Sequence, residues 1–353
     1  MRKKTQITDF VIPLLCFLFL FLKPKEVSSA VCDGIEFCIR RFIPAMLPYL
    51  IVSDYFFRVG GPHMLADKLG PIMSKLFGTG KMSAAPFVLG MTGGYPIGAK
   101  CIVDLRKSSS ISCIAANKLL SFCCGAGPAF TIGLVGSSVY GNPLMGLTLY
   151  AVQVISAVIT GLLPIFPSSE KEESSPYRFK TDGASVAFVK AVSGCTRTAA
   201  GICCFIILFT VVLKAQEMIL PDGILRASAA AFTELSTGCV SLAKQPLDWN
   251  IKFALTSAAI SFGGLCVFMQ TSALLYDAGL SAKTYLIGKL THGILSFFLA
   301  YPLSYLFRDT AAAGSFGTVL RPFSPFPWSL IAFAMYFLFF LQIPSSIWRK
   351  SAL

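Results

Sequence analysis

The chain has 353 residues, of which 55% are apolar and 13% are charged, and its formal net charge is +13. Soluble domains carry about 25% charged residues, so this composition excludes an ordinary soluble protein and indicates a polytopic, all-helical membrane protein. Most of the positive excess fits cytoplasmic loops, and basic residues at positions 2–4 and 349–350 predict that both termini are cytoplasmic. No Lys/Arg cluster lies on a soluble module with interleaved aromatics, so nucleic acid is not an expected partner.

Residues 1–29 have the outline of a signal peptide. A basic start is followed by an apolar run at 10–22 and by small residues at 27–30. The alternative is a retained first transmembrane helix, since residues 7–22 can cross a bilayer with local thinning. We expect retention, because an inner-membrane protein needs no cleaved export signal.

Several later stretches are long and apolar enough to cross a bilayer, which takes about 20 residues. They are residues 144–166, 199–220, 251–275, 286–307 and 328–347. Between residues 31 and 57, Pro44 and Pro48 are expected to kink or end a helix. An amphipathic stretch at 64–77 is expected to lie in the membrane interface. The polar segment 167–184 divides the chain into a first repeat, 30–166, and a second repeat, 185–353.

Small and polar clusters interrupt the apolar pattern at matching places in both halves. The interrupted elements are a short hairpin at 82–105 with a break at 92–98, a span at 111–139 broken at 124–128, a second hairpin at 227–244 with a break at 236–238, and a span at 251–275 broken at 263–264. Ala-Lys follows the hairpin cluster in both halves. Unwound backbone inside a membrane is tolerated only where protein shields it or where it lines a wet cavity. The pattern therefore predicts two inverted repeats, each with a re-entrant helical hairpin and a broken transmembrane helix.

The interruptions supply the candidate binding residues. Unwinding exposes N–H groups at a helix N-terminus, where roughly half a positive charge favours anions. The candidates at the hairpin breaks and on the broken helices are Thr92, Gly93, Gly94, Tyr95, Asn117, Ser121, Ser236, Thr237, Gly238, Ser261 and Gln270. Close helix packing is the alternative explanation for the glycines, and interhelical hydrogen bonding is the alternative for the polar side chains. Tyr95 either stacks on a planar solute or marks the membrane interface.

Two charged residues are candidates for ion coupling or charge compensation. Glu234, beside the second hairpin break, is the best acid for a coupling H⁺ or Na⁺, and a helix-capping carboxylate is its alternative role. Lys100 either acts inside the protein or snorkels to the cytoplasmic surface. The twelve cysteines contain no CxxC motif and the chain has two histidines, so no metal site and no other cofactor are expected. The sequence shows no recognisable Ser/His/Asp or Cys/His catalytic arrangement, and we do not expect an enzyme.

At these residues the chain resembles the sporulation integral membrane proteins of the YlbJ type, within the nucleoside-recognition (Gate) domain group. The matching pieces are residues 92–100, 117–128 with Phe130 and Gly133, 234–238, 261–270, and the paired prolines of 42–48. The resemblance implies a fold similar to concentrative nucleoside transporters and a role in moving dipicolinate into the forespore. Members of the group commonly carry Asn-type residues where this chain has Cys124 and Gly125.

The sequence thus predicts an integral protein of the bacterial cell membrane or forespore membrane that moves a small anion by alternating access. Dipicolinate is the leading solute. A nucleoside-like solute is an alternative within the same class. The alternative from another class is a membrane assembly factor that uses the Gate-type fold as a scaffold without transport.

Overall fold

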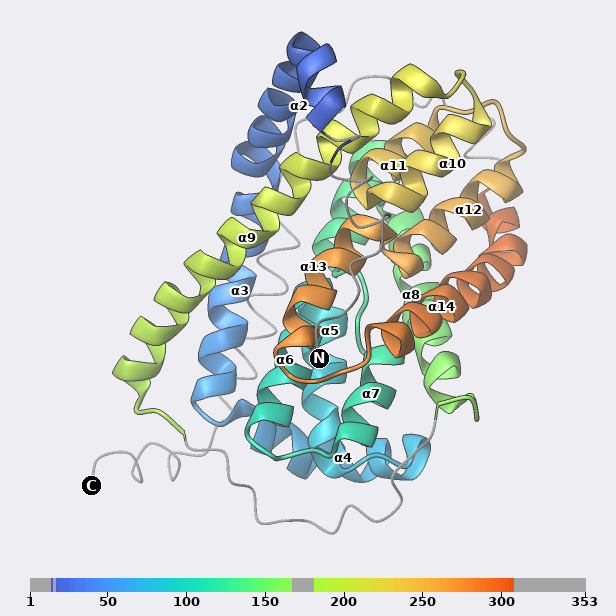
Figure 1. Ribbon diagram of the computed structural model, residues 1–353. Coiled ribbons are helices and arrows are strands. Elements are labelled where there is room, and N and C mark those ends of the chain that lie inside the picture. Colours follow the sequence, from blue (N-terminus) through green and yellow to red (C-terminus); the bar gives the residue numbers. More distant parts are fainter. Residues whose placement is uncertain (1–13, 15–16, 167–180, 308–353) are drawn as a thin grey trace, which may run out of the picture.

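A computed structural model describes residues 14, 17–166 and 181–307, and within these ranges the chain is helical with no strand. The elements follow one another in the order shown in Figure 1. They are α2 Pro24–Phe37, η1 Cys38–Phe42, α3 Ile43–Arg58, α4 Gly61–Phe77, η2 Lys81–Ser83, α5 Ala84–Gly93, α6 Tyr95–Lys107, α7 Cys113–Phe122, η3 Ala129–Val139, α8 Pro143–Leu162, α9 Ala184–Ile219, α10 Ile224–Thr233, α11 Leu235–Ala243, α12 Trp249–Phe262, α13 Gly264–Tyr276, α14 Ala282–Leu303 and η4 Ser304–Phe307.

Four helical stretches are long and apolar enough to cross a membrane. They are Pro143–Leu162, Ala184–Ile219, Trp249–Tyr276 and Ala282–Phe307. These helices coincide with four of the five spans that hydropathy predicts, and they support an all-helical membrane protein. The fifth predicted span, 328–347, lies outside the described residues, as do most of the predicted first helix and residues 167–180 of the connecting segment.

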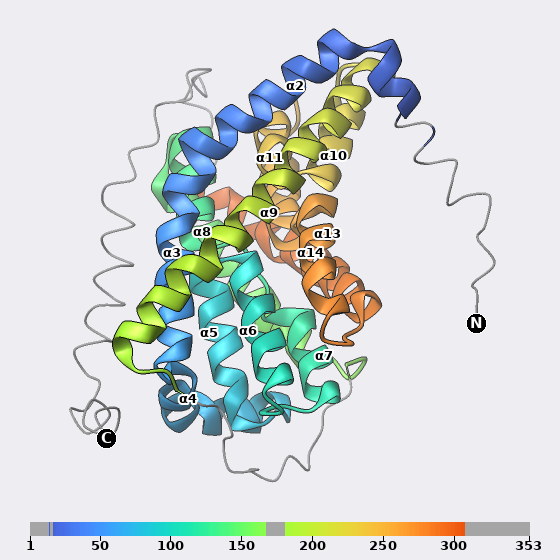
Figure 2. The same cartoon turned by 60° about the vertical axis from the view of Figure 1, so that its left-hand side comes forward.

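Helices α2, α3 and α9 lie side by side on one side of the molecule, and Figure 2 shows them in front of the shorter helices. Helix α9 buries one stripe, which includes Ala191, Cys195 and Ile202 at helical spacing, and leaves much of its remaining surface exposed. The prolines do not end the helix here. The chain passes from α2 to α3 through the π-helical turn η1, which Pro44 directly follows, and Pro48 lies inside α3. A π-turn and a proline are both recognised causes of a bend in a helix that nevertheless continues.

The short helices form two pairs, α5 with α6 and α10 with α11, and each pair is interrupted at a single residue. Gly94, with φ of +97°, separates α5 from α6, and Glu234 separates α10 from α11. The predicted breaks were therefore too wide at 92–98 and wrongly placed at 236–238, since Ser236, Thr237 and Gly238 lie in the first turn of helix α11, which begins at Leu235. Small and polar residues are compatible with a first helical turn, so their clustering did not mark the break itself.

This placement changes how the two halves correspond. If Gly94 matches Glu234, then Gly98 matches Gly238, because each lies four residues after its break. The Ala-Lys pairs that end at Lys100 and Lys244 are then out of register by four residues, about one helical turn. Their similarity in the sequence does not reflect equivalent positions.

The two broken spans are interrupted where the sequence predicts, to within one residue. Residues 123–127 are non-helical between α7 and η3. Gly263, with φ of +90°, separates α12 from α13, and Gly264, the first residue of α13, has φ of +79°. Glycine adopts these left-handed conformations without steric cost, so it allows a long apolar stretch to stop and restart within its length.

Candidate functional site

Three of the four interruptions border one cavity of about 150 Å³, and helix α13, which follows the fourth interruption, lines it from Cys266 onward. Its lining combines the interrupted segments with an apolar wall from the outer helices. The lining residues are Thr92–Pro96, Ala126, Gly127, Ala129, Phe130, Leu134, Glu234–Ser236, Cys266, Val267 and Gln270, together with Phe37, Phe42, Met46, Ile202 and Ile206. A larger hollow of about 360 Å³ lies among α10, α11, α12 and α14, but its lining is apolar apart from Ser228. The first cavity is therefore the better candidate site, because polar groups converge on it.

Direct backbone packing holds the interruptions together. A Cβ added at Gly127 would lie 3.2 Å from the Thr92 carbonyl oxygen and 3.4 Å from the Gly94 nitrogen. In the second half, a Cβ added at Gly264 would lie 3.2 Å from the Thr233 carbonyl oxygen and 3.3 Å from the Leu235 nitrogen. In each half, the break of the short helix pair therefore packs on the break of the long helix. The absence of a side chain at these glycines permits this approach.

Seven of the residues singled out from the sequence line the cavity. They are Thr92, Gly93, Gly94, Tyr95, Glu234, Ser236 and Gln270. The Thr92 hydroxyl donates to the Val88 carbonyl at 2.8 Å, within its own helix. The Gln270 amide lies 3.2 Å from the sulfur of Cys266, one turn earlier. Both side chains therefore bond within their own helices, Thr92 near the end of α5 and Gln270 in the middle of α13.

The other candidate ligands lie away from the lining. The Asn117 side chain accepts from the Ser281 N–H at 2.9 Å, and the Ser121 hydroxyl donates to the Lys118 carbonyl at 2.7 Å. Ser261 donates to Ser296 at 2.8 Å and so joins α12 to α14. Thr237 and Gly238 follow the lining residue Ser236 along α11. Their role in binding stays a prediction, whereas the contacts of Asn117 and Ser261 are hydrogen bonds between separate elements.

Glu234 forms the N-cap of α11. Its two carboxylate oxygens accept the backbone N–H groups of Ser236 at 2.9 Å and of Thr237 at 2.8 Å. This is the helix-capping role that the sequence left open. The carboxylate thus binds the N–H groups that we predicted would bind a solute. Glu234 also lines the cavity, so its acidic side chain is part of the cavity wall.

Tyr95 connects the two halves of the protein. Its hydroxyl donates to the Ile260 carbonyl, and a Cβ added at Gly263 would lie 2.8 Å from the ring carbon Cζ. The ring is also 4.7 Å from the ammonium nitrogen of Lys289, measured to the ring centroid. The tyrosine therefore borders the cavity while it packs against the break of the second long helix.

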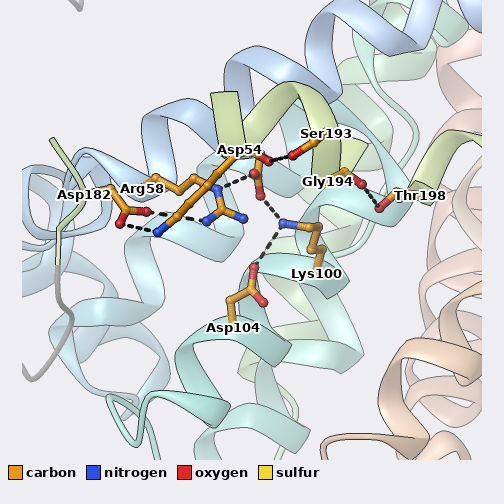
Figure 3. A network of polar contacts seen from close by, with 9 residues as sticks. Asp54, Arg58, Lys100, Asp104, Asp182, Ser193, Gly194 and Thr198 are labelled. Carbon is orange, nitrogen blue, oxygen red and sulfur yellow. Dashed lines mark hydrogen bonds and ion pairs between the residues drawn. The ribbon is translucent and has the colours of Figure 1, made fainter. Parts of the chain in front are cut away.

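Lys100 lies in an ion-pair network away from the cavity lining. Figure 3 shows the Asp54 carboxylate between Lys100 and Arg58, with Asp104 on the second side of Lys100. Asp182 continues the network to Arg58 at 3.6 Å. Burial alone would lower the pKa of Lys100, but the charges of Asp104 and Asp54 outweigh it, and the pKa is raised above its ordinary value. The network joins α3, α6 and the residues just before α9, and Lys100 carries its positive charge there.

A second polar cluster, whose residues were not among the predicted site residues, supports the break at residues 123–127. The Gln153 side chain pairs with both backbone groups of Ala126, accepting at 3.1 Å and donating at 2.8 Å. Lys289 donates to the Cys124 carbonyl at 2.7 Å and lies 2.9 Å from His292. These contacts satisfy backbone groups that the unwound chain would otherwise leave bare. The sequence did contain a signal for this cluster, because its residues are polar or charged and lie on long apolar spans. Burying such a side chain in a membrane costs free energy unless it has a partner.

The fold and the site together define an all-helical membrane protein with a cavity at the meeting point of interrupted helices. In a search of curated proteins, the chain is similar to the sporulation integral membrane protein YlbJ of Bacillus subtilis (strain 168). The two are 23% identical over 326 residues, which cover 80% of each chain. No protein-family model matches the chain. No solved structure matches it.

Proposed function

We propose that this protein is a solute carrier that works by alternating access around the cavity between its interrupted helices. In this proposal residues 30–166 and 185–353 are inverted repeats, and the pairs α5/α6 and α10/α11 are re-entrant hairpins. One observation carries the proposal: the breaks of both short helix pairs, the break at residues 123–127 and the first turn of α13 border the same cavity. Paired, interrupted helices that meet at one site are the usual construction of a secondary transporter's binding site.

The proposed solute is a small organic anion, with dipicolinate as the first candidate. A cavity of about 150 Å³ has the volume that accommodates a single benzene ring, which favours a one-ring solute over a larger nucleoside. Helices α6 and α13 begin at or beside the cavity, and their N-terminal ends favour negative charge. The relative in Bacillus subtilis is named as a sporulation protein, which supports a role in sporulation. The forespore is the proposed destination of the solute.

Filling the cavity is expected to stop transport. Ala129 lines the cavity at the start of η3, so Ala129→Trp places an indole ring in the proposed solute space. We expect uptake of labelled dipicolinate into proteoliposomes to fall to the level of protein-free liposomes. Ala151→Trp is the matched control, because Ala151 is exposed on the spanning helix α8. Full uptake by the Ala129 variant would contradict the assignment of the cavity, and transport of nucleosides alone would replace the solute. If the folded wild-type protein transported neither, a scaffold role in membrane assembly would be favoured.

Glu234 is the proposed coupling group on the cavity wall. Glu234→Gln keeps an acceptor for the N-terminus of α11 but removes the charge, so uptake is expected to lose its dependence on a proton or sodium gradient. The measurement compares uptake with and without each gradient. Glu217→Gln is the control, since Glu217 is an exposed carboxylate on α9. Unchanged gradient dependence in the Glu234 variant would remove this residue from coupling.

A further inference from the structure

A buried basic pair lies directly behind the cavity wall. Lys289 and His292 are three residues apart on the spanning helix α14, with exposed fractions of 1% and 0%. Among the described residues, no Asp or Glu forms an ion pair with Lys289. An ammonium group inside a membrane span costs at least roughly 2.5–3.5 kcal/mol, so its presence points to a function.

Hydrogen bonding determines how this pair carries protons. His292 Nε2 lies 2.8 Å from the Gln153 carbonyl oxygen, which only accepts, so Nε2 carries the hydrogen. Nδ1 is then the acceptor for the Lys289 ammonium at 2.9 Å. The ammonium also donates to the Cys124 carbonyl. A neutral amine has two hydrogens, enough to keep both bonds, so Lys289 can lose one proton to water without breaking the network.

The charge on this pair is close enough to affect the cavity. The Lys289 ammonium is 4.7 Å from the centroid of the Tyr95 ring, and Tyr95 lines the cavity. The titratable groups beside the ammonium are Tyr95 from α6, the Cys124 thiol from the unwound segment and His292 from α14 itself, and Tyr285 of α14 interacts with both Tyr95 and Cys124. None of these supplies a carboxylate. A negative charge entering the cavity would therefore stabilise the protonated pair, since the buried surroundings of Lys289 and His292 screen the interaction less than bulk water does.

We propose that Lys289 and His292 form a proton-binding site whose occupancy is linked to binding of an organic anion in the adjacent cavity. The inference rests on the proposed carrier function and adds the group that carries the proton. In the bound state Lys289 is an ammonium hydrogen-bonded to neutral His292, and release leaves the amine and a free H⁺. Linkage is reciprocal, so the anion raises proton affinity by the factor by which the proton raises anion affinity. The carrier then moves the anion together with a proton.

Calorimetric titration of the purified full chain with dipicolinate tests this linkage. Repeating the titration in buffers of different ionisation enthalpy measures proton uptake directly. Between about pH 6 and about pH 8.5 the carboxylates of the ligand stay ionised, so changes in affinity report on the protein. We expect uptake of up to about one proton per anion and weaker binding as the pH rises, because the ammonium form is lost.

Lys289→Met is expected to bind the anion more weakly, with no proton uptake and no change in affinity across this range. Lys252→Met is the matched control, because Lys252 is also a buried lysine that donates to a backbone carbonyl, that of Ala243, and it does not line the cavity. Lys252→Met should keep the proton uptake. His292→Phe removes an acceptor of the ammonium and should move the midpoint of proton uptake to lower pH, even if Lys289→Met does not fold.

The outcomes separate this proposal from the carrier function. Anion binding without proton uptake in the wild type, proton uptake that survives Lys289→Met, or an unchanged midpoint in His292→Phe would overturn the role of the pair and leave the carrier standing. If proton uptake were lost in Glu234→Gln but kept in Lys289→Met, the linkage would be assigned to the Glu234 carboxylate instead. A folded wild-type protein that binds no small anion would overturn both proposals.

Discussion

Gly90→Ala and Gly238→Ala are expected to lower the thermal stability of the protein more than any other single methyl addition in the short helix pairs. A Cβ added at Gly90 would lie 1.8 Å from the Cys123 carbonyl oxygen, and one added at Gly238 would lie 2.1 Å from the Ala231 Cα. Both obstacles are backbone atoms, which cannot rotate away as a side chain does. Overpacking of this kind costs about 1–3 kcal/mol or more in free energy of unfolding.

Gly201→Ala is the matched control for these variants. Gly201 is exposed within α9, and a Cβ added there has no neighbour within 4 Å. An alanine at an open helical position stabilises by about 0.5–1 kcal/mol relative to glycine. The measurement is the midpoint of thermal unfolding in detergent, followed by size-exclusion chromatography. Equal midpoints for Gly90→Ala and Gly201→Ala would show that α5 and residues 123–127 do not approach as closely as described.

Asp54→Asn is expected to give the second large loss of stability. The Asp54 side chain is 4% exposed and accepts from Arg58 at 2.6 Å and from Lys100. Removing its charge leaves two partly buried cations facing a neutral amide. Breaking a fully buried pair costs about 3–5 kcal/mol, and the partial exposure of both cations reduces the expected loss to about 1–3 kcal/mol. Thermal unfolding midpoints of the purified variants measure this loss.

Asp222→Asn provides the comparison. Asp222 pairs with Arg226 at the start of α10, but its side chain is 92% exposed. Exposed pairs of this kind contribute about 0–1 kcal/mol, so the midpoint should hardly move. A larger loss in Asp222→Asn than in Asp54→Asn would mean that the network in Figure 3 does not hold α3 and α6 together.

Hydropathy alone located the four described spans, because length and apolar composition are the properties that the bilayer selects. Local chemistry also located the breaks at residues 123–127 and at Gly263-Gly264, where glycine marks chain reversal or unwinding. The short helix pairs were harder to place. The second break is at Glu234, where no glycine marks it in the sequence, so the predicted break began two residues too late, at Ser236.

The tertiary structure decided which interruptions meet and which polar residues reach them. Lys289 contacts Cys124 across 165 residues, and Gln153 contacts Ala126 across 27. Such pairings depend on how helices pack, and no local propensity encodes that packing. Composition and periodicity therefore determined that the chain is a helical membrane protein with unwound points. Only folding could decide that a buried lysine and histidine stand behind the cavity, because their partners come from distant segments of the chain.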